Sequence, residues 1–83
     1  MKKIQFYENK NIIHKQLRLL RKKSRLTQGE LASKMQLLNI NIDQQMISRI
    51  ERNERIVTDY ELASFGEILG VEVSELLKDY RAF

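Results

Sequence analysis

Residues 26–52 are predicted to form two short helices. Two segments in this range have apolar residues at helical spacing, and each follows a helix start signal. The first signal is the pair Thr27 and Glu30, which has the spacing of a capping box. The second is Asp43, an efficient N-cap residue, followed by Gln-Gln-Met-Ile-Ser-Arg-Ile-Glu-Arg. The pattern therefore predicts one helix after Thr27 and another over about residues 43–52, with a connector between them.

The segment after Asp43 has two different faces. Ile47 and Ile50 share one side at helical spacing, whereas Gln, Ser and Arg residues occupy the other. A short helix that buries isoleucine and exposes glutamine and arginine is suited to insertion into a polar partner. The DNA major groove admits an α-helix, and it is the partner that we expect.

Helical spacing extends over the rest of the chain. Asn11 is a good N-cap for a first helix. The apolar residues of this helix are three or four positions apart: Ile13, Leu17 and Leu20. Thr58 and Glu61 form a second capping box, and Gly70 ends the helix that it starts. Ser74 caps a short fifth helix, so the sequence predicts an all-α fold with five helices.

Length and composition indicate one small domain. The chain has 83 residues, no Pro and only three Gly, so nothing marks an interdomain linker. We expect an N-terminal arm over residues 1–11, the domain over residues 12–78 and a C-terminal tail over residues 79–83. The chain has no Cys, which excludes disulfides and thiolate metal sites.

The charge is divided unevenly along the chain. Residues 1–34 contain ten Lys or Arg and two Glu, a net charge of +8. Residues 35–83 contain five Lys or Arg and nine Asp or Glu, a net charge of −4. The basic half favours a polyanionic partner, whereas the acidic half favours solvent or a protein.

Several blocks of the sequence, in order, resemble the Xre family of helix-turn-helix domains, to which the lambda and Cro repressors belong. The blocks are Leu20-Arg21, Leu26-Thr27-Gln28-x-x-Leu31-Ala32, Ile47-Ser48-Arg49-Ile50-Glu51 and Leu69-Gly70-Val71-x-Val73-x-x-Leu76. The resemblance covers about residues 12–77. It implies a lambda-repressor-like five-helix bundle that binds specific DNA sequences, mostly as a dimeric repressor.

Within this resemblance, the helix over about residues 43–52 is the recognition helix. Gln44 and Gln45 match family positions that reach base edges, and a Gln amide suits adenine N6 and N7. Arg49 lies one turn beyond Gln45 and is suited to a bidentate contact with guanine. Ser48 lies on the same side, where it is expected to touch a base or a phosphate.

Other residues are expected to contact phosphates or to support the fold. Gln28 lies at a helix N-terminus, where free N–H groups attract phosphate. Further phosphate contacts are expected after the recognition helix, from Arg52, Asn53 and Arg55. In the family, the positions of Arg21 and Glu51 form an ion pair between the first and third helices, so these two residues are given a structural role.

The chain departs from the family pattern in the connector between its second and third helices. Residues 34–43 are about five residues longer than the usual turn and contain no Gly. The extra length predicts an apolar flap that packs on the core or forms part of a partner surface. Its members are Leu37, Leu38, Ile40 and Ile42.

Functions other than DNA binding have less support in the sequence. No catalytic or metal-binding pattern occurs, so the chain is not expected to be an enzyme or to need a cofactor. No apolar run is long enough to cross a membrane, and a cytoplasmic, nucleoid-associated regulator of a bacterium or phage is expected. The alternative is an antitoxin or another regulator whose acidic C-terminal half binds a toxin or regulatory peptide. We expect a homodimer that contacts double-stranded DNA.

Overall fold

Five helices follow one another in residues 8–78, the part of the chain that the computed structural model describes. They are α1 (His14–Lys23), α2 (Gln28–Leu37), α3 (Gln44–Glu51), α4 (Asp59–Leu69) and α5 (Val73–Leu76). No strand occurs among the described residues. The predicted all-α class and the number of helices are therefore confirmed, whereas the tail at 79–83 and most of the arm lie outside the described residues.

Three helices begin where the capping signals predict. Thr27, Asp43 and Thr58 each accept a hydrogen bond from the backbone N–H three residues later, which starts α2, α3 and α4. Gly70 ends α4 in the left-handed conformation, with φ 69°. These local signals set where α3 begins despite the long connector before it.

The predicted starts of α1 and α5 were wrong. Helix α1 begins at His14 after Ile13, and Asn11 turns its amide to more distant backbone groups instead of capping the helix. Helix α5 begins at Val73 after Glu72, one residue before the predicted cap Ser74. In both cases the short helix is positioned by packing, since neither start has a side-chain cap.

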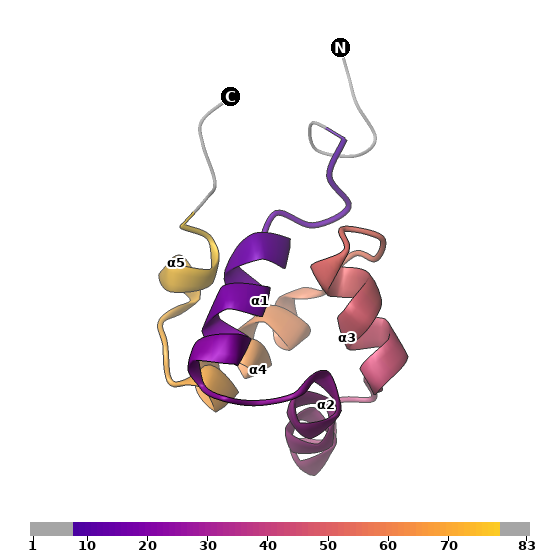
Figure 1. The fold of residues 1–83 in the computed structure, drawn as a ribbon, viewed down its shortest axis with the longest axis vertical. Coiled ribbons are helices and arrows are strands. Elements are labelled where there is room, and N and C mark those ends of the chain that lie inside the picture. Colours follow the sequence, from indigo (N-terminus) through magenta and orange to yellow (C-terminus); the bar gives the residue numbers. More distant parts are fainter. Residues whose placement is uncertain (1–7, 79–83) are drawn as a thin grey trace.

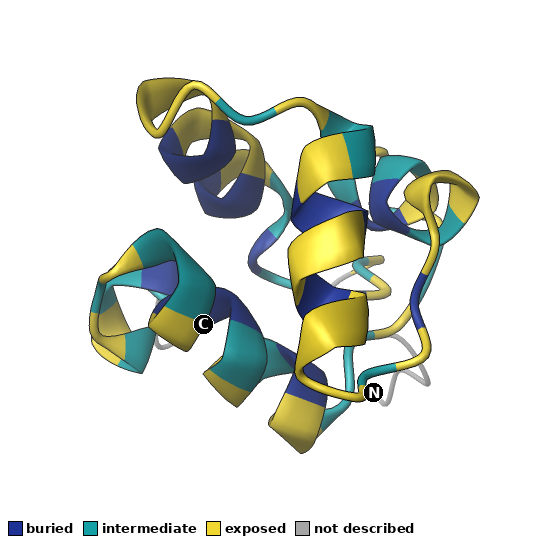
Figure 2. Ribbon diagram, turned by 90° about the horizontal axis from the view of Figure 1, so that it is seen from below, coloured by how far each residue is buried: buried dark blue, intermediate teal, exposed yellow. Residues whose placement is uncertain are grey.

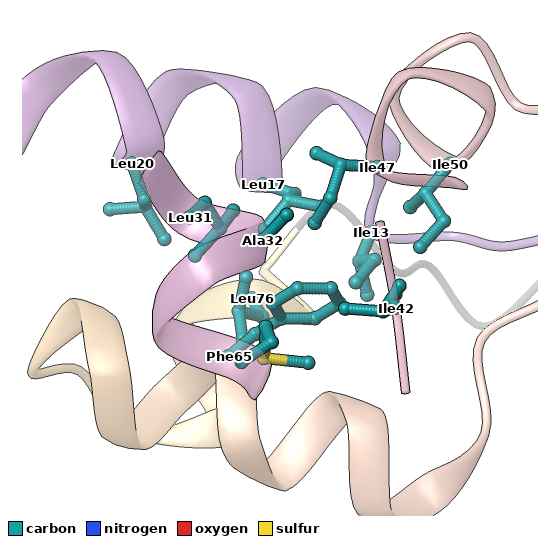
Figure 3. Packing of buried hydrophobic residues seen from close by; sticks show 11 residues of the cluster. Ile13, Leu17, Leu20, Leu31, Ala32, Ile42, Ile47, Ile50, Phe65 and Leu76 are labelled. Atoms are coloured by element: carbon teal, nitrogen blue, oxygen red, sulfur yellow. The ribbon is translucent and has the colours of Figure 1, made fainter. Parts of the chain in front are cut away.

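The core is formed by one apolar residue or more from each helix, as Figure 3 shows. Phe65 of α4 and Leu76 of α5 point toward Leu31 and Ala32 of α2, and all four are buried. Leu17 of α1 completes this side of the cluster. Because every helix contributes to the same cluster, the position of α3 depends on the whole bundle.

Helix α1 lies between α3 and α5 in Figure 1, with α4 behind it and α2 at the lower end. It packs against α3, α4 and α5, while α2 packs against α3 and α4. Seen from below in Figure 2, the helices turn buried residues inward and exposed residues outward. The outer faces of α2 and α3 are thus available to a partner.

The long connector divides into a packed part and an exposed part. Ile42 is fully buried, Ile40 packs on the core, and Gln36 Nε2 donates to the Ile42 carbonyl at 3.0 Å. Leu37 is 83% exposed and Leu38 is 38% exposed. The four residues of the predicted flap therefore separate: Ile40 and Ile42 pack on the core, whereas Leu37 and Leu38 are exposed.

Candidate nucleic-acid interface

The outward face of α3 carries the four residues that the sequence assigns to base contacts. Gln44, Gln45 and Arg49 are exposed and Ser48 is half-buried, while Ile47 and Ile50 on the opposite face are buried. Asp43 Oδ1 accepts from the Met46 N–H at 2.9 Å, so Gln44 is the first residue of the helix. The structure thus gathers these polar side chains on the first two turns of one helix.

The N-terminus of α2 lies next to the start of α3. The Oε1 atom of Gln44 is 3.5 Å from the position that a Cβ atom on Gly29 would occupy. At this end of α2, Thr27 and Glu30 complete the capping box, with hydrogen bonds of 3.0 and 2.8 Å. The first-turn N–H groups of α2 and the first side chains of α3 therefore form one continuous polar surface.

A buried ion pair holds α3 against α1. Arg21 Nε donates to Glu51 Oε2 at 2.6 Å, and its Nη2 donates to Oε1 at 3.1 Å. The two side chains are only 9% and 4% exposed. The remaining guanidinium nitrogen, Arg21 Nη1, donates to the Leu26 carbonyl at 2.8 Å, which ties the α1–α2 loop to the same pair.

Gln28 joins this cluster from α2. Its Nε2 donates to Glu51 Oε1 at 3.0 Å, so one carboxylate connects the first three helices. The bond fixes the side chain of Gln28 and leaves the N-terminus of α2 facing outward. The sequence predicted the partners Arg21 and Glu51 but not that Gln28 would bind the same carboxylate.

Arg49 and Arg52 differ in their surroundings. Arg52 Nη1 donates to Ser48 Oγ at 2.7 Å, and its Nη2 lies 3.3 Å from Glu54 Oε1, with both charged side chains more than half exposed. Exposed pairs of this kind contribute little free energy, so a phosphate can displace Glu54. Arg49 is exposed and has no ion-pair partner within residues 8–78.

Arg55, which the sequence assigns to a phosphate contact, forms an ion pair with Glu61 within the protein. Its Nη1 and Nη2 donate to Glu61 Oε1 and Oε2 at 2.9 and 3.0 Å, and Nη1 also donates to the Ile56 carbonyl. The Glu61 hydrogen bond raises the pKa of Arg55, against the effect of burial. The guanidinium is thus engaged in joining the α3–α4 loop to α4.

Asn53 is also engaged within the protein. It has φ 62°, the left-handed conformation that often ends a helix and that Asn tolerates. Its Oδ1 accepts from the N–H groups of Lys10 and Asn11, and its Nδ2 donates to Asn9. Sequence reasoning missed these contacts because they join residues more than 40 positions apart.

The outer face of α1 adds positive charge beside this surface. Its exposed cations are Lys15, Arg18, Lys22 and Lys23, followed by Arg25 in the loop to α2. The helix itself contains no acidic residue. Because α1 packs against α3, its positive charge adds to the attraction of this part of the domain for a polyanion.

Residues 8–78 contain neither a candidate membrane span nor a candidate metal-binding cluster. No helix of this region is long and apolar enough to cross a bilayer. No group of three or more His, Cys, Asp or Glu in the same region is arranged to hold a metal ion.

The capped α2, the connector and the exposed α3, packed on α1 through a buried ion pair, define a helix-turn-helix domain. Comparison with protein-family models matches residues 17–76 to the helix-turn-helix family of the Xre and lambda Cro type, and the chain belongs to this family. It is a family of DNA-binding transcription regulators rather than of enzymes. Comparison with curated proteins and with solved structures gives no match.

Proposed function

We propose that the protein is a sequence-specific transcriptional repressor that inserts α3 into the DNA major groove. The observation that carries this proposal is the outward face of the capped helix α3, where Gln44 and Gln45 are exposed in the first turn and Arg49 in the last. Base edges offer acceptor and donor pairs that Gln and Arg side chains match in two-point contacts. The buried faces of the same helix fix its direction relative to the rest of the domain.

Arg49 and the two glutamines have different roles in this proposal. Arg49 donates to guanine O6 and N7, while Gln44 and Gln45 pair with adenine, each contact discriminating by roughly 1–3 kcal/mol. Ser48 contacts a base or a phosphate once Arg52 releases it. The support for Arg49 is its exposure and its freedom from any ion pair in the described region.

Phosphate contacts are assigned to groups that the fold leaves available. The N-terminus of α2 at Gln28 offers N–H groups and a positive dipole end to one phosphate. Arg52, 56% exposed, offers a guanidinium to another. Asn53 and Arg55, which the sequence placed in the same class, are assigned to holding the loop because their side chains are bonded internally.

We propose that a homodimer in the cytoplasm of a bacterial or phage-infected cell places two α3 helices in successive major grooves, roughly 34–36 Å apart. Sedimentation of the protein with and without operator DNA tests this step. A dimer on a palindromic site supports it, whereas one protomer on an asymmetric site contradicts it.

Selection from random duplexes at two salt concentrations tests the function itself. A repressor enriches a specific site and loses affinity steeply with salt, because phosphate contacts release counterions. Weak binding that selects no sequence contradicts the proposal.

A protein-binding role is the second candidate. Ile56 and Tyr60, in the acidic half of the chain, are 64% and 60% exposed, which favours a protein partner at this place. A toxin or regulatory peptide would then be the ligand. Binding of such a partner, with no selection of DNA sequence, would support this role in place of the first.

A further inference from the structure

The segment before α1 is bonded to the turn after α3 by two asparagines, Asn11 and Asn53. Asn11 is 8% exposed, and its Nδ2 donates to the carbonyl of Ile50 at 3.0 Å and to that of Arg55 at 2.9 Å. Its Oδ1 accepts from the Ile13 N–H at 3.1 Å. One amide thus spans the turn between Ile50 and Arg55 and also shapes the entry to α1.

Asn53 completes the connection from the other side. Its Oδ1 accepts from the N–H groups of Lys10 and Asn11, at 2.9 and 3.3 Å, and its Nδ2 donates to Asn9 Oδ1 at 2.8 Å. Its φ of 62° suits Asn and Gly. The turn is therefore shaped by its own backbone and held in place by residues 9–11.

Arg52 lies within this turn, between the two carbonyls that Asn11 binds. Its own side chain points away from them, toward Ser48 and Glu54 on the exposed side. Because residues 9–11 hold the turn, Arg52 already occupies one position in the protein without DNA. Such preorganisation removes part of the entropy that ordering a loop on binding would cost.

We propose that Asn11 and Asn53 are positioning residues for DNA binding, which hold the turn after α3 so that Arg52 meets a phosphate. The inference rests on the proposed function, because it assigns Arg52 to the DNA backbone. Asn11 and Asn53 themselves do not touch DNA in this account. Their effect passes through Arg52.

The test compares Asn53→Gly and Asn11→Ala with the wild type on the duplex that the wild type selects. Asn53→Gly keeps the left-handed conformation and removes only the side-chain bonds to residues 9–11. The control is Gly70→Ala, which should lower stability at the C-terminal end of α4, where an added Cβ atom would have no neighbour within 4 Å. Affinities are measured over a range of salt at a temperature where unfolding curves show every variant folded.

Both asparagine variants should weaken binding about five- to tenfold and lower the dependence on salt by about one phosphate contact. Gly70→Ala should change neither quantity. In an Arg52→Ala background, Asn53→Gly should cause no further loss of affinity, since the guanidinium that Asn53 positions is already absent. The absence of a further loss of affinity in this background distinguishes the positioning of Arg52 from a purely structural role.

Two results overturn the inference. Asparagine variants that bind DNA like Gly70→Ala would show that the bonds serve stability alone. If Asn53→Gly weakened binding as much in the Arg52→Ala background as in the wild type, the asparagines would act through another group. If the wild type selects no duplex, the proposed function fails as well, and that outcome is visible before any variant is compared.

Discussion

Arg55 binds Glu61 through two nearly equal hydrogen bonds, of 2.9 and 3.0 Å, and thereby closes the loop between α3 and α4. The Glu61 side chain is 4% exposed and also accepts from the Thr58 N–H at 3.0 Å. An arginine that the sequence assigns to the DNA backbone thus joins the loop after α3 to α4.

Glu61→Gln should destabilise the protein by about 2–4 kcal/mol at neutral pH, because Arg55 would lose its charged partner. Burial raises the pKa of Glu61, but hydrogen bonds from Arg55 and Thr58 outweigh this and hold it below its ordinary value. The stabilisation is therefore complete at neutral pH and is lost as the pH falls through the lowered pKa. Urea unfolding between pH 7 and about pH 3 measures this dependence.

The matched control for this prediction is Glu67→Gln, since Glu67 is an exposed carboxylate on the same helix. It should leave the stability within about 0.5 kcal/mol of the wild type. A Glu61→Gln variant whose stability falls with acid as steeply as that of the wild type would argue against the assignment.

Arg21→Met should cost about 3–5 kcal/mol, because it leaves the Glu51 carboxylate buried without its cation. The double variant Arg21→Met/Glu51→Leu should recover much of this loss, since no charge is then buried. Arg18→Met on the exposed side of α1 serves as the control. Thermal unfolding of the set would refute the structural role if the single and double variants were equally unstable.

Arg52→Ala should weaken binding to every DNA sequence by a similar factor and lower the salt slope by about one. A phosphate contact carries no base information, so the preferred site should stay the same. Fluorescence anisotropy with the preferred duplex and a scrambled one measures both effects. A changed preferred site would mean that Arg52 reads a base.

Two glycines should respond to alanine in opposite directions. Gly29 lies in the first turn of α2, and a Cβ there would meet Gln44 only at an ordinary contact distance of 3.5 Å. Gly29→Ala should therefore raise stability by about 0.5–1 kcal/mol through helix propensity. Gly70→Ala should lower it by about 1–2 kcal/mol, because φ is 69°. Calorimetry of the pair checks both signs.

Local signals explain which parts of the fold could be predicted. Thr27, Asp43 and Thr58 bind N–H groups three residues away, so their spacing in the sequence contains the whole interaction. The contacts of Asn11 and Asn53 join segments brought together only by folding. Asn11 has the residue type and place of an N-cap, and nothing nearby in the sequence distinguishes the two roles.

The candidate site likewise has a part that the sequence predicts and a part that it does not. The polar face of α3 follows from helical spacing, and Gln44, Gln45 and Arg49 are exposed as the pattern indicates. Arg52 and Arg55 look alike in sequence, yet one is exposed and the other binds Glu61. The difference arises because Glu61 is turned toward the loop by its capping bond to Thr58. Such a contact depends on the path of the loop between α3 and α4.

The most direct test of the account is the affinity of wild type and Arg49→Ala for the selected duplex and for each of its single-base-pair variants. The account predicts that Arg49→Ala loses discrimination at one guanine in each half-site, by roughly 1–3 kcal/mol, and keeps it elsewhere. An equal loss of affinity for all duplexes, with every base preference retained, would contradict base reading by α3.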